Sequence, residues 1–291
     1  MRLIIVNLIK STASFSKVIL LSKFRNILIS GYKSNDKCII LGNGPSLIKS
    51  VEKNKEILLK YDLVCVNNFV KSNLFEELKP RFYILSASVL FMDDKDLSEL
   101  YINIRNDIFK NLAEKTSWDI YLMIPFTAKK CTKFQHLIYS CSSLKPIYFN
   151  QTPVEGFSFF NHLCFGKGIG MPRPHNILIP AIMNCIYLNY KEIYLLGADH
   201  SWLPEISVNE RNEALVNQKH FYDEIESKPE KMQDYISRPR KLHEIIHKFY
   251  LTFKGYWEIK SFAEKQGVKI YNSSETSMID AFDRIEIESI K

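Results

Sequence analysis

Short apolar runs that alternate with stretches of helical spacing are the feature of this chain that most restricts its fold. The runs cover residues 38–41, 63–66, 82–85, 120–123, 193–196 and 268–271. Strands that alternate with helices pair in parallel and are joined by right-handed crossovers. The sequence therefore predicts an α/β fold with a mainly parallel sheet, helices on both faces and a site at the carboxyl ends of the strands.

The composition sets the class of protein and the kind of partner. A chain of 291 residues that is 46% hydrophobic and 24% charged can bury a core without disulfides. Its 39 Lys and Arg against 32 Asp and Glu give a net charge of +7, which favours phosphate-bearing molecules or acidic lipid headgroups. The excess is mild, and we expect no nucleic-acid partner. Six cysteines without a C-x-x-C pair indicate a reduced, cytoplasmic protein.

Residues 1–36 form a basic segment with apolar stretches at 3–6 and 18–21. Because Lys10, Lys17 and Lys23 interrupt these stretches, we expect no membrane-spanning helix. Residues 1–30 instead indicate an amphipathic segment that lies on the inner face of the cytoplasmic membrane. The alternative is a helix packed against its own domain or against a second subunit in a homo-oligomer.

The rest of the chain divides by composition into three parts. Residues 37–202 carry most of the alternating pattern and form the main domain. Residues 203–253 are polar, contain three prolines and are too long for a passive connection, so they predict a helical lid. Residues 254–291 return to helix and strand and complete the main domain.

Polar side chains follow several of the predicted strands. Asn43, Asn67, Ser88 and Asp199 stand just beyond the first, second, third and fifth apolar runs. In an open α/β sheet such positions gather at one crevice, although each could alternatively cap a helix. Ser88 and Asp199 are accordingly candidate ligand-binding residues, and Asp199 could orient the neighbouring His200.

The most informative short motif is Gly42-Asn43-Gly44-Pro45-Ser46, directly after the first run. Its glycines permit a turn whose backbone N–H groups and following helix face an anion. It is neither a P-loop nor a G-x-G-x-x-G fingerprint. The alternative is a structural turn with Ser46 as the N-cap of the next helix.

A second candidate stands before the apolar helix predicted at 177–188. Arg173 beside a helix start is well placed to hold a phosphate. His175 or Asn176 could cap the helix, and Asn176 could also contact the ligand.

Three histidines in the lid region suggest two chemistries. His220, followed by Tyr222, is a general base if the lid brings it to an acceptor hydroxyl. His243-Glu244-Ile245-Ile246-His247 fits the H-E-x-x-H zinc pattern, which makes a zinc hydrolase the least favoured alternative because no third ligand follows.

Taken together, these residues resemble the bacterial lipooligosaccharide sialyltransferases of glycosyltransferase family 42 and related uncharacterised α/β proteins. The similarity lies in residues 39–47, 65–69 and 190–199, with a weaker match over 255–272. It implies a variant Rossmann fold and a nucleotide-sugar donor, CMP-sialic acid being favoured. It also implies metal-independent, inverting transfer to a hydroxyl of a surface glycan or glycolipid, such as a lipopolysaccharide or capsule precursor.

The same resemblance assigns roles to individual residues. Gly42, Asn43, Gly44 and Asn67 would hold the nucleotide and phosphate, and Arg173 would assist them. His220 would be the base, with Tyr222 nearby, while the choice between His200 and His220 stays open.

The chain departs from the family where tyrosines are replaced by His200, Ser201 and Trp202, and where residues 151–172 form an insertion. Archaeal pterin pyrophosphokinases are similar in the Gly-x-Gly and Gly-Ala-Asp regions. They supply the alternative of phosphoryl transfer with Mg²⁺ held by carboxylates.

Overall fold

The computed structural model describes residues 2–24, 31–222, 228–234 and 236–290. Positions 1, 25–30, 223–227, 235 and 291 lie outside the described residues, and with them small parts of the predicted N-terminal segment and lid.

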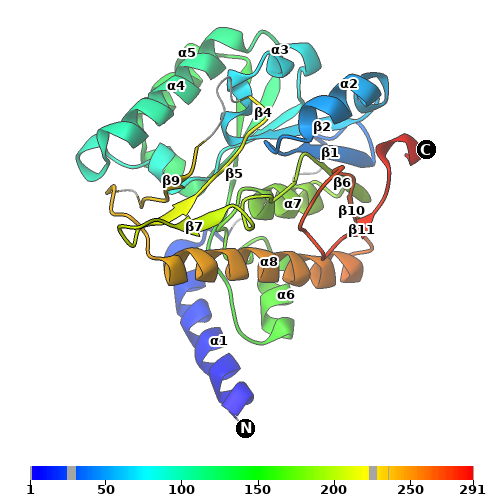
Figure 1. Ribbon diagram of the computed structural model, residues 1–291. Helices are drawn as coiled ribbons and strands as arrows, with labels where there is room; N and C mark the ends of the chain where they lie inside the picture. Colours follow the sequence, from blue (N-terminus) through cyan, green and yellow to red (C-terminus); the bar gives the residue numbers. More distant parts are fainter. Residues whose placement is uncertain (1, 25–30, 223–227, 235, 291) are drawn as a thin grey trace.

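One sheet of eight strands, all paired in parallel, organises the molecule in the order β11-β10-β6-β1-β2-β3-β4-β5 (Figure 1). The strands are β1 (Lys37–Leu41), β2 (Asp62–Val66), β3 (Phe82–Ile84), β4 (Ile120–Pro125), β5 (Leu144–Phe149), β6 (Glu192–Leu196), β10 (Lys269–Asn272) and β11 (Asp283–Arg284). The predicted parallel sheet is confirmed. The two edge strands, β5 and β11, were not predicted.

Helices cover both faces of the sheet, each over its own hydrophobic cluster (Figure 1). On one face lie α2 (Leu47–Leu58), α3 (Leu74–Leu78), α4 (Glu99–Lys115) and α5 (Thr132–Ser140). On the other lie α6 (Ser158–Gly166), α7 (Leu178–Tyr187) and α8 (Leu242–Lys265). Every residue of α7 is buried, which agrees with the apolar helix predicted at 177–188. Burial on both sides explains why the central strands read as continuous apolar runs.

The lid differs from its prediction. Residues 203–253 were expected to be helical, but the described part contains a small antiparallel sheet of β7 (Ile206–Val208), β8 (Ala214–Val216) and β9 (Glu230–Lys231). Ala214 and Val216 of β8 pack with Ile245 and Phe249 of α8 in a separate hydrophobic cluster. A single helix, α8, also spans the boundary placed between residues 253 and 254. Polar composition identified an insertion but not its secondary structure.

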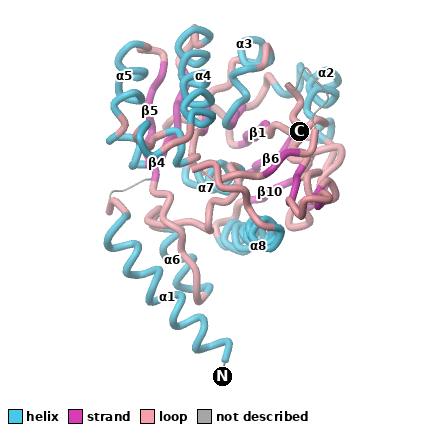
Figure 2. The backbone as a smooth tube through the Cα atoms, turned by 60° about the vertical axis from the view of Figure 1, so that its left-hand side comes forward, coloured by secondary structure: helices cyan, strands magenta, loops and turns pink. Residues whose placement is uncertain are grey.

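The N-terminal helix α1 (Arg2–Leu21) projects from the body of the protein beside α6 (Figures 1 and 2). By length and composition alone, residues 3–21 are long and apolar enough to cross a membrane, with a mean hydropathy of 1.6. The expectation that the lysines leave no stretch of spanning length was therefore wrong on length and composition alone.

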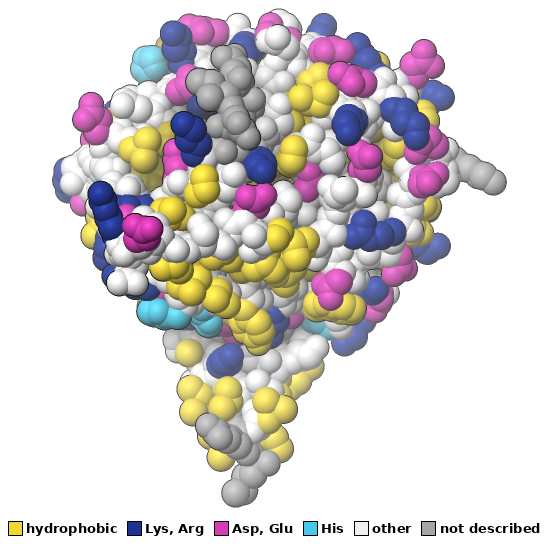
Figure 3. Space-filling model, viewed as in Figure 1, with side chains coloured by type: hydrophobic (Ala, Val, Ile, Leu, Met, Phe, Trp, Pro, Cys, Tyr) yellow, Lys and Arg dark blue, Asp and Glu magenta, His cyan; other side chains and the backbone are white. Residues whose placement is uncertain are grey.

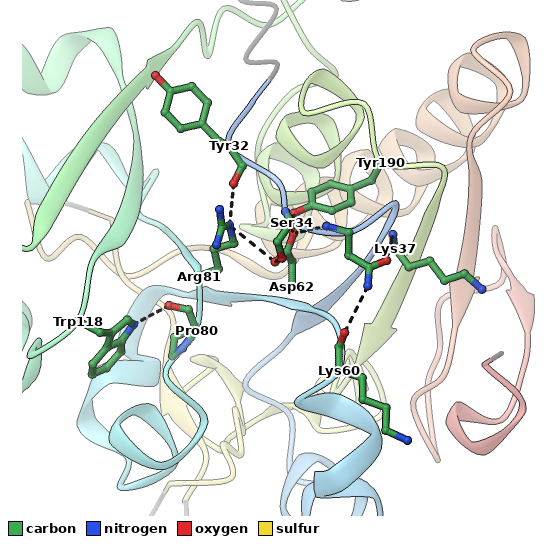
Figure 4. A network of polar contacts seen from close by, with 10 residues as sticks. Tyr32, Ser34, Lys37, Lys60, Asp62, Pro80, Arg81, Trp118 and Tyr190 are labelled. Carbon is green, nitrogen blue, oxygen red and sulfur yellow. Dashed lines mark hydrogen bonds and ion pairs between the residues drawn. The ribbon is translucent and has the colours of Figure 1, made fainter.

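A polar network secures the amino ends of the strands (Figure 4). Asp62, the first residue of β2, accepts hydrogen bonds from the backbone N–H of Ser34 at 2.7 Å, from the Ser34 hydroxyl and from the Tyr190 hydroxyl at 2.6 Å. Arg81 lies 3.7 Å from the same buried carboxylate. The network stabilises the sheet. It lies at the edge opposite the carboxyl ends of the strands, where the site is predicted.

Candidate active site

The turn after β1 lies where the order of the strands reverses. From β1 the chain adds β2, β3, β4 and β5 on one side, and it then crosses back to add β6 and β10 on the other side of β1. In doubly wound α/β folds, ligands bind in the crevice at this reversal, outside the carboxyl ends of the strands.

Glycines allow the β1 turn to pack directly against the turn after β6. A Cβ atom on Gly42 would lie 2.4 Å from the carbonyl oxygen of Gly197, and one on Gly44 would lie 2.6 Å from the Asp199 carboxyl group. The N–H groups of Gly42 and Gly44 donate at 2.8 Å to the carbonyl oxygens of Leu196 and Gly197. These two groups therefore join the turns, whereas the sequence predicted that they face an anion.

Asp199 and Ser46 are bound to each other. The Asp199 carboxylate accepts hydrogen bonds from the Ser46 backbone N–H at 2.8 Å and from the Ser46 hydroxyl. Asp199 is only 2% exposed, and burial raises its pKa. Ser46 makes no side-chain capping bond to α2. The pair fixes the start of α2 and uses one acceptor site on each Asp199 oxygen, so any contact of Asp199 with a ligand or Mg²⁺ would be added to this pairing.

A cavity of about 230 Å³ at the reversal, called here the switch-point cavity, gathers most of the predicted site. The predicted residues that line it are Gly42, Asn43, Gly44, Asn67, Asn176, Asp199 and His220. The amide oxygens of Asn43 and Asn67 are buried and have no hydrogen-bond partner among the described residues. Buried polar atoms are usually satisfied, so the two unpaired oxygens make this cavity a candidate ligand site.

The backbone at Asn67 is held in an unusual conformation. Its φ of 49° lies in the left-handed region, which asparagine tolerates better than most residues. The Tyr83 hydroxyl donates to the Asn67 carbonyl oxygen and accepts from the Val70 N–H at 2.9 Å. This clamp fixes the strand tip, and such strain is concentrated at functional sites.

His220 reaches the cavity because the lid segment docks on the β1 turn. The Phe221 N–H donates to the Asn43 carbonyl oxygen at 3.1 Å, and the Phe221 ring lies 5.3 Å from that of Phe69. The His220 ring stacks on Tyr222 at 5.1 Å. Tyr222 itself packs against the hydrophobic cluster beside α2–α5 and is not among the residues that line the cavity.

His200 lies in the wall of the same cavity but faces the protein interior. It is 7% exposed, and its Nε2 lies 2.7 Å from the Tyr256 hydroxyl, which donates to the amide oxygen of Asn176 at 3.3 Å. Burial lowers the pKa of His200 to about 3, so the ring is neutral near pH 7. His200 and Tyr256 thus orient Asn176. The sequence did not reveal Tyr256, which reads as part of an apolar helix face.

Two predicted phosphate-binding residues lie in a neighbouring cavity. Ser88 and Arg173 line a larger space of about 900 Å³ under the first half of α8, called here the α8 cavity. Arg173 forms an ion pair with Glu155 at 2.7 Å. The two cavities share Asn67, His175, Asn176 and Ile177. The structure therefore divides the predicted nucleotide-binding set between two adjoining spaces.

The H-E-x-x-H motif also borders the α8 cavity, through His243, Glu244 and His247. Arg238 binds Glu244 through two hydrogen bonds at 3.0 and 3.2 Å and lowers its pKa to about 2. The Glu244 carboxylate also caps α8 by accepting from the Lys241 N–H at 2.8 Å. Glu244 acts as a capping residue here, and a general-base role would require breaking these bonds. Within the described ranges, no group of three or more His, Cys, Asp and Glu residues could hold a metal ion.

The sheet order and the switch-point cavity define a Rossmann-like α/β protein. The sequence matches no known family model and no curated protein. Among solved structures, the fold is similar to that of the MAf glycosyltransferase from Magnetospirillum magneticum AMB-1, with a TM-score of 0.50 and 12% identity. The alignment covers 99% of this chain and 39% of that one, so this chain spans less than half of its neighbour. At this identity the likeness concerns the fold.

Proposed function

We propose that this protein is a glycosyltransferase that binds a nucleotide sugar in the switch-point cavity, with CMP-sialic acid as the favoured donor. It transfers the sugar with inversion to a hydroxyl of a surface glycan. The fold shared with a glycosyltransferase supports the class of enzyme. The choice of donor follows from the resemblance of residues 39–47, 65–69 and 190–199 to the sialyltransferases.

The observation that carries it is the pair of buried amide oxygens of Asn43 and Asn67, which have no partner among the described residues. A nucleoside offers suitable donors, because ribose carries two hydroxyls and cytosine an amino group. Leaving such oxygens unpaired costs about 1–3 kcal/mol each, so a ligand that donates to both gains affinity.

In the proposed reaction, His220 takes the proton from the acceptor hydroxyl. The acceptor oxygen forms a bond to the anomeric carbon, and the bond from that carbon to the phosphate oxygen breaks. The electron pair leaves with CMP. No metal is needed if fixed donors stabilise the leaving phosphate, and we propose metal-independent transfer.

Turnover with a panel of nucleotide sugars tests this function. We expect release of CMP from CMP-sialic acid, with or without a chelator. His220→Asn should reduce turnover by about a hundred-fold because proton transfer loses its base. His136→Asn, at an exposed position on α5, is the matched control. Turnover of a uridine donor but not of CMP-sialic acid would refute the donor, and activity lost with the chelator would favour the Mg²⁺-dependent alternative.

We also propose that α1 and α6 place the enzyme on an anionic membrane surface. Two serines of α1 bind its own domain: Ser14 accepts from the Glu155 N–H at 2.9 Å, and Ser11 from the Phe157 N–H at 3.0 Å. Most apolar side chains of α1 are exposed, Leu3, Leu20 and Leu21 by between 64% and 80%. Hydrophobic side chains accordingly gather on this projecting part of the molecule (Figure 3). A helix with this reversed polarity suits an apolar surrounding.

Three further observations favour lipid over a second copy of the chain. Helix α6 lies beside α1 (Figure 2), and its Phe159 and Leu163 side chains are exposed. Lys10 and Lys23 on and after α1 are exposed and can meet acidic headgroups. The helix is about 30 Å long, which gives it an extended apolar side to lay along a membrane surface.

Flotation with vesicles of phosphatidylglycerol and phosphatidylcholine tests this docking. Replacing exposed Ile9 and Leu20 by Gln should weaken vesicle binding at least about ten-fold, since each loses apolar burial of about 2 kcal/mol. Tyr139→Gln removes an equally exposed apolar side chain on α5 and should have no effect. If the Gln variant instead dissociates a dimer and the wild type ignores vesicles, the surface is an interface between subunits.

A further inference from the structure

The α8 cavity is positively charged in a way that the proposed donor site does not require. Its described lining includes Arg173, Arg240 and Lys248, whereas Glu244 is its one acidic residue. Arg238 pairs with Glu244 and also with Asp234, so the charge of Glu244 is partly offset and the described lining holds more cations than carboxylates.

Two of these cations have no counter-charge among the residues that the structure describes. Within the described part of the chain, neither Arg240 nor Lys248 pairs with a carboxylate, although Glu155 does pair with Arg173. The Nε atom of Arg240 is buried and has no hydrogen-bond partner among the described residues. Burial and the neighbouring Arg240 both lower the pKa of Lys248. Unpaired, partly desolvated like charges are costly, and an anion would relieve the cost.

The cations converge on the wall between the two cavities. Burial and, in decreasing order, the charges of Lys248, Arg173, His247 and Arg240 together lower the pKa of His175 to about 4. His175 lines both cavities, together with Asn67, Asn176 and Ile177. A molecule in the α8 cavity can therefore reach a donor in the switch-point cavity. Leu21 at the end of α1 lines the same cavity, on the side of the proposed membrane contact.

We infer that the α8 cavity is the acceptor subsite and that it takes a saccharide carrying an anionic group, phosphate or carboxylate, bound by Arg240 and Lys248. This inference rests on the proposed function, because an acceptor subsite requires a donor bound in the adjoining switch-point cavity. The anionic group belongs either to a soluble saccharide or to the phosphate that links a saccharide to a lipid.

Calorimetric titration of the full chain with inorganic phosphate, with and without saturating CMP, tests the inference. We expect phosphate to bind in both conditions. The double variant Arg240→Gln, Lys248→Gln should bind phosphate at least about ten-fold more weakly, because charge-assisted hydrogen bonds to phosphate are lost. Its CMP affinity should be unchanged. The matched control replaces exposed Lys110 and Arg211 by Gln and should bind phosphate like the wild type.

Two results would overturn the inference: phosphate affinity unchanged in the double variant, or phosphate displaced by CMP, which would assign the cations to the donor. CMP binding is measured separately and depends on Asn43, so failure of the donor site is recognised independently. Glucose 1-phosphate and hexyl phosphate then distinguish the sources. Tighter binding of the former indicates a soluble saccharide, and tighter binding of the latter a lipid-linked one.

Discussion

At the scale of single residues, the sequence predicted which polar residues stand at the strand tips. It did not predict which side chains these residues bind. Gly42, Asn43 and Asn67 follow apolar runs, and they line the switch-point cavity as predicted. Asp199 also lies there, yet Ser46 occupies both of its carboxylate oxygens. The two residues are 153 positions apart, and no local pattern shows that two turns will interlock. Arg240 and Lys248 were missed for the same reason, because an unpaired cation is visible only once its surroundings are known.

His200 predicts a pH dependence of stability. Its pKa is about 3 in the folded protein and about 6.5 when unfolded, so between these values the unfolded chain binds the extra proton. Stability from His200 is therefore complete above about pH 6.5 and is lost as the pH falls towards 3. Urea unfolding at about pH 7.5 and about pH 4.5 measures this loss. Between the two pH values, the free energy of unfolding should fall by about 3 kcal/mol less in His200→Asn than in the wild type. Asparagine tolerates the positive φ of 52° at this position.

His136→Asn on the surface of α5 is the control for this experiment and should keep the wild-type pH dependence. Equal pH dependence in wild type and His200→Asn would mean that the His200 ring is charged in the folded state.

At the scale of elements, hydrophobic periodicity predicted the strands and helices whose side chains form the core. The apolar runs became the inner strands because both of their faces are buried, while the edge strand β5 carries Lys145 and Pro146 and lacks that pattern. The lid's antiparallel sheet was mistaken for helix because its strands are only two or three residues long. For α1 the pattern indicated amphipathicity, but not that the polar side faces inward.

The network around Asp62 predicts a purely structural variant. Asp62→Ala should destabilise the fold by about 3 kcal/mol, since it leaves the buried Tyr190 hydroxyl and the Ser34 N–H without their acceptor. CMP affinity should not change, because Asp62 lies at the opposite edge of the sheet. Chemical denaturation and CMP titration of the same sample check both statements. Asp119→Ala, an exposed residue 3.6 Å from Lys145, should stay close to wild-type stability. A loss of CMP affinity in folded Asp62→Ala would place the nucleotide elsewhere.

At the scale of the whole molecule, two adjoining cavities and a projecting apolar helix form one arrangement. The switch-point cavity lies at the tips of β1, β2 and β6, the α8 cavity adjoins it beneath α8, and Leu21 at the end of α1 lines that second space. In the proposed function, the donor would bind in the switch-point cavity, the acceptor in the adjoining α8 cavity, and the membrane would lie beside α1. The fold class was predictable from the sequence, whereas this division into two cavities required the tertiary structure.

The measurement that bears most directly on the account is the affinity for CMP of the wild type and of Asn43→Ala, with Asn111→Ala on α4 as the matched control. We expect the wild type and the control to bind CMP equally. Asn43→Ala should bind about ten-fold more weakly, since one hydrogen bond to a buried amide oxygen is lost. Failure of the wild type to bind CMP, or equal binding by Asn43→Ala, would contradict a nucleotide site at the turn after β1.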